Sequence, residues 1–366
     1  MKKTKVYLQR PLFLGDSPYY DYLTKNVSPK IEYVNIAGKN QGIVKDIKKF
    51  KILNKTKRAI KLTIRNLFPG MPNAHLVRDG NYDVIHCAHC MSLNKKPWVM
   101  DVEYVNQFWA GGIPKKQKKF ILRLLKSKYC KKILAWTKWT EKGILKEFPE
   151  IENKIEVIYP AIKPVNFKKI KSKNIRLLFV SRRFYFKGGL HALEVMDRLT
   201  KKYDNVEGTI ISDTPKEILD RYARNKKIKF RDVMPKEELF FQIYPRTDIL
   251  IYPSYTDTFG FAIIEALSFG IPVVSVAGQS RSDLIGDGKT GFIVEEPKNF
   301  QTEDLNNLNS LKNIINEIEK KVELLIKNKK LRDNMSKNCL QEFKKGKFSI
   351  KERNKKIEKI YFEAIR

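Results

Sequence analysis

Short apolar runs alternate along the chain with longer segments of helical spacing. In the first half the strand-like runs are Lys5–Gln9, Ile31–Ile36, Asp83–His86, Trp98–Val102, Lys132–Trp136 and Lys154–Ile158. In the second half they are Arg176–Ser181, Val206–Ser212, Ile228–Asp232, Asp248–Pro253, Pro272–Val276 and Gly291–Val294. Helical patterns between them include Leu190–Lys202, Pro235–Tyr244 and Phe261–Phe269. Two alternating series predict an α/β protein with two doubly wound domains, each built on a parallel sheet. The polar, basic segment 163–174, which contains a proline, predicts the boundary between them.

Composition adds a strong positive charge to this picture. The 366 residues are 42% hydrophobic, which excludes wholesale disorder, and the formal net charge is +33. Residues 1–170 hold +22 of it. Such an excess predicts an anionic partner on the first half, although a general bias toward lysine explains part of it. No uncharged apolar run is long enough to cross a membrane, and the charged start is unlike a signal peptide.

Four cysteines occur, at positions 87, 90, 130 and 339. So few in a long chain predict no dependence on disulfides and fit a cytoplasmic protein. His86 and the run Cys87-Ala88-His89-Cys90 could form a metal or redox cluster. A zinc site needs a second ligand cluster, which the sequence lacks, so we expect these residues to end a buried strand instead.

Cations and glycines follow the strand at 176–181. Ser181 ends this run, Arg182 and Lys187 lie five residues apart, and Gly188-Gly189 opens a helix. Ligands of doubly wound domains bind beyond the carboxyl ends of strands, so both cations are expected there. A guanidinium and an ammonium suit a diphosphate, whereas the alternative is two ordinary surface cations.

A second informative stretch follows the strand at 248–253. Asp257 lies in a loop, Gly260 lies where a helix begins, and Glu265 follows eight residues after Asp257. Free amides at a helix start donate to anions, and glycine allows close backbone approach. The two acids add acceptors for sugar hydroxyls.

With these residues the chain resembles the GT-B glycosyltransferases of family 4. There the signature is Glu, seven residues and Glu, with Phe-Gly after the first acid and Glu-Ala-Leu, glycine and Pro-Val-Val afterwards. Phe259-Gly260, Glu265-Ala266-Leu267 and Pro272-Val273-Val274 match it, and Arg182 and Lys187-Gly188 match the family's phosphate pair. Close resemblance covers residues 175–296. It implies two Rossmann-like domains facing a central cleft: an acceptor domain 1–165, completed by helix 350–366, and a nucleotide-sugar domain 166–349.

The resemblance also implies roles for single residues. Arg182 and Lys187 would neutralise the donor diphosphate, Glu265 would hold the ribose, and Asp257 would face the donor sugar beside the amides of Phe259 and Gly260. Ser181 and Met234 would line the donor site, Met234 near the base. The family usually has Glu at 257, so the shorter Asp257 leaves the sugar open.

The implied reaction is a retaining transfer of a sugar from a UDP- or GDP-linked donor to a hydroxyl, with no metal or other cofactor. Asp101-Val102-Glu103 is the nearest approach to an Asp-x-Asp metal motif. In the first half Glu103 stands where members often have histidine, and Gly15 where they have a glycine pair. Glu103 is the first-half candidate for catalysis, with Asp101, His86 and Gly15 as acceptor-side candidates; a solvated loop end or a helix cap is the alternative.

Two basic, amphipathic runs, 45–61 and 115–128, suggest a peripheral association with an anionic membrane at its inner face, and hence a lipid-linked or membrane-surface glycan as acceptor. The alternative is that their apolar stripes pack on the first domain. A nucleic-acid-binding protein would also be basic, but no known binding module is recognisable, and the run 115–128 holds a single aromatic residue, Phe120. A pyridoxal-dependent phosphorylase and a catalytically inactive scaffold are the remaining alternatives, and the retained cations and Glu265 argue against the scaffold.

Overall fold

The structure is a computed structural model, and two compact units divide the chain. It describes residues 3–10, 18–36, 70–110, 117–164, 166–295, 305–309 and 311–366, and isolated residues between 56 and 68; the side chains of Pro18 and Asp21 are not described. Unit 1 contains Met1–Lys163 and Lys347–Arg366, and unit 2 contains Pro164–Gly346. The sequence prediction put the division after residue 165 and the return at residue 350. Gly15 and most of the run 45–61 lie outside the described residues.

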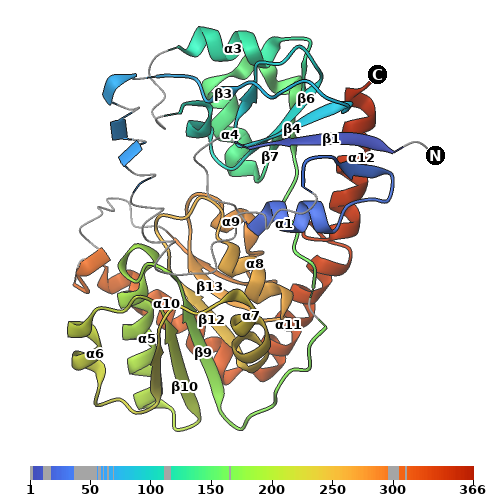
Figure 1. The fold of residues 1–366 in the computed structure, drawn as a ribbon. Helices are drawn as coiled ribbons and strands as arrows, with labels where there is room; N and C mark the ends of the chain where they lie inside the picture. The colour runs from blue at the N-terminus through green and yellow to red at the C-terminus, as the bar shows by residue number, and fades with distance from the viewer. Residues whose placement is uncertain are drawn as a thin grey trace. The chain divides into compact units, whose positions relative to one another are not determined.

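Unit 1 is built on a parallel sheet in the order β2-β1-β4-β6-β7-β8. Its strands are β1 (Thr4–Gln9), β2 (Ile31–Tyr33), β4 (Val84–Ala88), β6 (Trp98–Val102), β7 (Cys130–Ala135) and β8 (Ile155–Val157), with a separate pair β3 (Ala74–His75) and β5 (Met91–Ser92). Its helices are α1 (Pro18–Lys25), α3 (Lys118–Lys126), α4 (Lys138–Glu147) and α12 (Ile350–Ala364), with the 3-10 turns η1 (Val105–Phe108) and η2 (Pro149–Lys154). The C-terminal α12 packs against β6 and β7 of this sheet (Figure 1).

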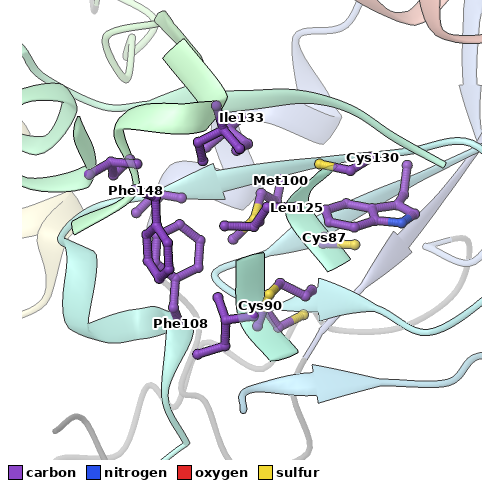
Figure 2. Close-up of a cluster of buried hydrophobic side chains, with 14 of the residues drawn as sticks. Cys87, Cys90, Met100, Phe108, Leu125, Cys130, Ile133 and Phe148 are labelled. Carbon is purple, nitrogen blue, oxygen red and sulfur yellow. The ribbon is translucent and has the colours of Figure 1, made fainter. Parts of the chain in front are cut away.

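The core of unit 1 contains the cysteines that suggested a metal or redox cluster. Cys87, Cys90 and Cys130 are at most 1% exposed and lie among Met100, Phe108, Leu125, Ile133 and Phe148 (Figure 2). Burial raises the pKa of Cys87, so its thiol stays protonated and unreactive. No group of three metal-ligating side chains occurs among the residues that the structure describes. These cysteines therefore act as core side chains.

Helix α3 forms most of the described part, residues 117–128, of the basic run 115–128. Its Ile121 and Leu125 are fully buried in the same core, because apolar residues four apart share one helix face. Lys118, Lys119, Arg123 and Lys126 remain exposed. The apolar stripe therefore packs inside unit 1, as the second interpretation of this run expected. In the described part of the chain, no helix is both long and apolar enough for a membrane span.

Unit 2 is built on a parallel sheet in the order β11-β10-β9-β12-β13-β14. The strands are β9 (Ile175–Val180), β10 (Val206–Ile211), β11 (Ile228–Arg231), β12 (Ile249–Tyr252), β13 (Val273–Val276) and β14 (Gly291–Val294). The helices are α5 (Gly189–Lys202), α6 (Lys216–Tyr222), α7 (Lys236–Glu238), α8 (Phe261–Ser268), α9 (Arg281–Leu284), α10 (Lys312–Lys327) and α11 (Lys329–Lys344). Helices α5 and α10 contact each other on one side of the sheet, and α8 and α11 lie on the other (Figure 1).

The helix predicted over Pro235–Tyr244 is the main local difference from the sequence prediction. The chain instead passes from α7 into a π-helical turn, η4 (Leu239–Ile243), and then a 3-10 turn, η5 (Tyr244–Arg246). Pro245 explains the change, because proline has no N–H to continue an α-helix and its ring clashes with the preceding turn. Tyr244 is thereby turned into the interior, where its side chain is fully buried.

Candidate active site

The loop after β9 carries Arg182 and Lys187. Ser181 Oγ accepts a hydrogen bond of 3.0 Å from the Arg183 N–H, which turns the chain at the end of the strand. The 3-10 turn η3 (Tyr185–Lys187) follows, and Gly188 leads into α5. Both cations therefore lie at the carboxyl end of β9, where this type of sheet binds ligands.

Gly188 brings this loop against the end of β12. It has φ of +72°, and a Cβ there would lie 2.1 Å from the Pro253 carbonyl oxygen. Only glycine tolerates both the left-handed conformation and this approach. The Thr256 hydroxyl also donates to the Phe186 carbonyl oxygen at 3.1 Å. The loops that follow two neighbouring strands, β9 and β12, thus form one surface.

Lys187 and Asp257 meet on that surface. Lys187 Nζ lies 3.1 Å from Asp257 Oδ1 and donates to the Thr256 carbonyl oxygen at 2.7 Å. The Tyr252 hydroxyl donates to Asp257 Oδ2 at 2.7 Å. Burial lowers the pKa of Lys187, and the neighbouring Asp257 carboxylate opposes that shift. The Asp257 carboxylate thus holds the Lys187 ammonium in place, and that ammonium can bind an anionic ligand.

The start of α8 supplies the next part of the site. Gly260 precedes the helix with φ of +89°, and Phe259 is buried beside it. Ser280 Oγ donates to the Phe259 carbonyl oxygen at 3.0 Å. Because the first amides of a helix have no intrahelical acceptor, this end of α8 is suited to an anionic group.

Arg281 supports the same loop from the interior of unit 2. The sequence had not indicated this residue. It is fully buried, and its Nε and Nη2 donate to the carbonyl oxygens of Val276 and Ala277, each at 2.8 Å. Its Nη1 lies 3.5 Å from the Asp257 carbonyl oxygen. Packing decides whether a guanidinium is buried against carbonyl oxygens, so no sequence pattern could indicate this role of Arg281.

Glu265 on α8 lies at the edge of the same surface and is 8% exposed. Lys236 Nζ lies 2.8 Å from its Oε1, and the Tyr244 hydroxyl donates to its Oε2 at 3.1 Å. Lys236 comes two residues after the half-buried Met234, in the segment that leaves β11. The structure therefore brings the region of Met234 beside Glu265, and it adds Lys236, which the sequence had not singled out.

Arg182 interacts electrostatically with both carboxylates, Asp257 and Glu265. Solvent reaches its side chain, yet surrounding protein desolvates the guanidinium enough to lower its pKa, while Tyr252, Glu265 and Asp257 oppose the shift. Arginine keeps its charge well above neutral pH even so. Two cations, two acids and a helix start therefore converge at the carboxyl ends of β9 and β12.

In unit 1, Glu103 follows β6 and is half-buried. Its N–H donates to Gln107 Oε1 at 2.8 Å, and its carbonyl oxygen accepts from Thr140 Oγ1 at 2.5 Å. These bonds hold the Glu103 backbone against η1 and α4. A role for the Glu103 carboxylate in catalysis stays a prediction.

The acceptor-side role expected for His86 and Asp101 does not fit their positions. Both side chains are 0% exposed, and His86 Nε2 lies 2.7 Å from Asp101 Oδ2. His86 Nδ1 shares a hydrogen bond with the Tyr361 hydroxyl of α12. Asp101 is the fourth residue of a buried strand, so its carboxylate lies inside the unit and has an internal partner. These residues join α12 to the sheet, and we correct the expectation accordingly.

Comparison with known proteins relates this surface to a family of sugar-transferring enzymes. Residues 163–341 match the model of the glycosyl transferases group 1. Over this segment the chain is similar to the group 1 glycosyl transferases. The match covers the surface formed by Arg182, Lys187, Asp257 and Glu265, the part of the chain in which the sequence resemblance was closest.

Curated relatives share only part of their length with this chain. It is 27% identical over 242 residues to a 41.2 kDa protein of the cps region of Klebsiella pneumoniae, covering 60% of this chain and 59% of that protein. It is 24% identical over 249 residues to a glycosyltransferase of Methanocaldococcus jannaschii, covering 60% and 63%. The chain thus spans about 60% of the length of these curated relatives.

Solved structures extend the likeness to the whole fold. A glycosyltransferase of Rickettsia africae has a TM-score of 0.62 at 18% identity, over 100% of this chain and 99% of the other. HepE of Anabaena, in complex with UDP and glucose, has a TM-score of 0.59 at 13% identity, over 98% of each chain. Identities this low show the fold alone, and that fold is GT-B, with a Rossmann-like sheet in each unit.

Proposed function

We propose that this protein transfers a sugar from a nucleoside diphosphate sugar to a hydroxyl group of a glycan acceptor. The observation that carries the proposal is the Lys187–Asp257 pair beside Arg182, at the carboxyl ends of β9 and β12. It combines cations for a diphosphate with a carboxylate for sugar hydroxyls, within the segment 163–341 that matches the glycosyl transferases group 1. Unit 2 would hold the donor.

The proposed chemistry follows from where charge develops. The bond between the sugar and the diphosphate oxygen breaks, which leaves negative charge on the diphosphate and positive charge on the sugar ring. Arg182 and Lys187 would stabilise the diphosphate, and the amides at the start of α8 would face the same charge. The acceptor hydroxyl attacks the sugar carbon from the face of the leaving group, and its proton passes to a diphosphate oxygen. This retaining course is the one that the family resemblance implies.

For the donor we propose a UDP- or GDP-linked sugar. The complexes of HepE with UDP and with UDP-glucose support the uridine form, although the likeness to HepE extends only to the fold. We also propose that donor binding needs no metal ion or other cofactor, since the two cations of the site can themselves neutralise a diphosphate. Binding in the presence of EDTA tests this; loss of binding would contradict it.

For the acceptor side we propose a glycan presented at an anionic membrane, on the cytoplasmic face. The exposed cations of α3 support the proposal in a purely electrostatic form, because the apolar stripe of that helix is buried. Flotation with vesicles of phosphatidylglycerol should show binding that weakens with salt. The absence of binding at physiological salt would exclude the membrane.

A thermal-shift screen tests the function itself. We expect one of UDP, GDP or ADP, and the corresponding nucleotide sugar, to raise the melting temperature of the wild type, and both shifts to vanish in Lys187→Ala and Glu265→Ala. The control is Lys227→Ala, because Lys227 Nζ also binds backbone carbonyl oxygens and an aspartate, Asp204 at 3.2 Å, but belongs to the β11 side of unit 2. If no nucleotide shifts the melting temperature while DNA or RNA binds in a salt-sensitive way, the protein is a nucleic-acid-binding protein instead.

A further inference from the structure

The two acids of the candidate donor site are held in the same way. Asp257 has the Tyr252 hydroxyl on one oxygen and Lys187 on the other, at 2.7 and 3.1 Å. Glu265 has the Tyr244 hydroxyl on one oxygen and Lys236 on the other, at 3.1 and 2.8 Å. Each carboxylate therefore has one tyrosine and one lysine as partners, from different parts of unit 2.

The first tyrosine is fixed by the sheet. Tyr252 is the last residue of β12 and is 4% exposed, and its ring is stacked near Phe179 of β9, with ring centroids 6.3 Å apart. Burial raises the pKa of Tyr252 well above its ordinary value, and the Asp257 carboxylate raises it further. The hydroxyl therefore keeps its proton and remains a donor to Asp257.

The second tyrosine is fixed by the turn that replaces the predicted helix. Tyr244 in η5 is fully buried, its ring stacked on Phe269 with centroids 5.2 Å apart. The edge of the ring meets Phe240, with centroids 5.6 Å apart. Since this packing prevents the whole side chain from swinging away, its hydroxyl offers Glu265 a donor at one fixed position.

The two lysine side chains can change conformation more easily than the two buried tyrosine side chains. The side chains of Lys187 and Lys236 are 19% and 31% exposed, on flexible four-carbon stems. A bound anion can attract such an ammonium away from its carboxylate, whereas a buried phenol cannot leave. When Lys187 turns to a diphosphate, Asp257 keeps only Tyr252 among these two partners.

We propose that Tyr252 and Tyr244 are positioning residues, which hold Asp257 and Glu265 in place for the donor while the two lysines exchange partners. The inference rests on the proposed function and deepens it. It assigns Tyr252 to the sugar end of the donor, through Asp257, and Tyr244 to the nucleoside end, through Glu265. The two tyrosines should therefore affect different ligands.

The experiment compares Tyr252→Phe and Tyr244→Phe in the full chain. Dissociation constants are measured by calorimetry for the nucleoside diphosphate that the wild type binds and for its sugar conjugate. Tyr244→Phe should weaken both ligands about tenfold, the effect of losing a hydrogen bond to a charged group. Tyr252→Phe should weaken the nucleotide sugar about tenfold and change the affinity for the nucleoside diphosphate less than about twofold.

Tyr222→Phe is the matched control. Tyr222 is also buried, and its hydroxyl donates to a carboxylate, Glu194 Oε2, at 2.8 Å, on α6 and α5 of the same unit. This variant should leave both affinities unchanged. Melting temperatures without ligand, measured for all three variants, separate positioning from a general loss of stability.

Two results would overturn the inference. One is that both site variants bind like Tyr222→Phe. The other is that both weaken the two ligands equally, in proportion to a fall in melting temperature, which would mark a purely structural role. If the wild type binds no nucleotide sugar at all, the proposed function fails, and this inference fails with it.

Discussion

Lys187 is a partly buried ammonium whose charge the proposed donor site requires. Burial lowers its pKa below the ordinary 10.5, and Asp257 limits the shift. A lysine with a lowered pKa loses its proton earlier as pH rises. Affinity for a nucleoside diphosphate should therefore be full near neutral pH and fall as the pH rises through the lowered pKa of Lys187, before it reaches 10.5.

Lys187→Arg checks which group is responsible for that fall. Arginine stays charged above about pH 12, so in this variant the fall should move to higher pH. The measurement is the dissociation constant of the nucleoside diphosphate from about pH 7 to about pH 10, with circular dichroism to confirm that the fold persists. An alkaline fall that stays at the same pH in Lys187→Arg would assign it to another residue.

Residues of the site could be predicted where the chain itself sets their spacing. Arg182 and Lys187 follow β9, and Asp257 follows β12. These two strands are neighbours in the sheet, so its topology brings the three residues together. The tyrosines could not be predicted, because the partner of a buried hydroxyl depends on the packing of its ring. For His86 and Asp101, by contrast, the sequence predicted a role that their positions in the structure do not fit. Their position near strand ends suggested a ligand, whereas their burial makes them partners of each other and of α12.

At the scale of elements, the hydrophobic period and the length of each apolar run were sufficient to predict most strands of both sheets. Every strand expected from an apolar run is present, and β6 and β14 have the predicted bounds. The run Pro235–Tyr244 was harder, because its apolar spacing fits an α-helix and does not reveal that the turns next to Pro245 become π-helical and 3-10. The small pair β3 and β5 gave no signal, since two-residue strands have no period.

The contact between the β9 and β12 loops depends on one glycine. In Gly188→Ala a methyl group would meet the Pro253 carbonyl oxygen in a left-handed backbone conformation. We expect this variant to lose about 2–4 kcal/mol of unfolding free energy, from backbone strain and overlap together, and to lose nucleotide binding. Urea unfolding followed by far-ultraviolet circular dichroism measures the change.

Gly288→Ala separates the two causes. Gly288 also has a positive φ, +69°, but nothing lies within 4 Å of the position of a new Cβ. This variant should lose only about 1–2 kcal/mol, from the backbone alone, and should keep its affinity for nucleotides. Equal losses in the two variants would mean that the approach to Pro253 carries no cost.

At the scale of the whole molecule, the chain returns to unit 1 through its last helix. Arg353 of α12 is 3% exposed, and its Nη2 donates to the carbonyl oxygens of Tyr22 and Asn26 at 3.2 and 3.3 Å. Glu358 binds Lys30 at 2.9 Å, and the Tyr361 hydroxyl lies 2.8 Å from that of Tyr33. These contacts join residues more than 300 positions apart, so the C-terminal helix is part of the N-terminal unit.

The Tyr361 hydroxyl is the innermost of these contacts. Tyr361→Phe keeps the ring but removes the partner of His86 Nδ1 and of Tyr33, inside a unit from which water is excluded. A buried polar group that loses its partner costs about 1–3 kcal/mol, and we expect unit 1 to lose that much unfolding free energy. All four tryptophans of the chain, Trp98, Trp109, Trp136 and Trp139, belong to unit 1, so tryptophan fluorescence during urea unfolding reports on this unit.

The control is Lys359→Ala on the same helix. Lys359 is 75% exposed and lies 3.7 Å from the exposed Glu363, so the urea midpoint of this variant should not move. If Tyr361→Phe also leaves the midpoint unchanged, the hydroxyl network does not hold α12 to unit 1, and the contacts of Arg353 and Glu358 with the apolar packing of Ile357 and Ile360 do so instead.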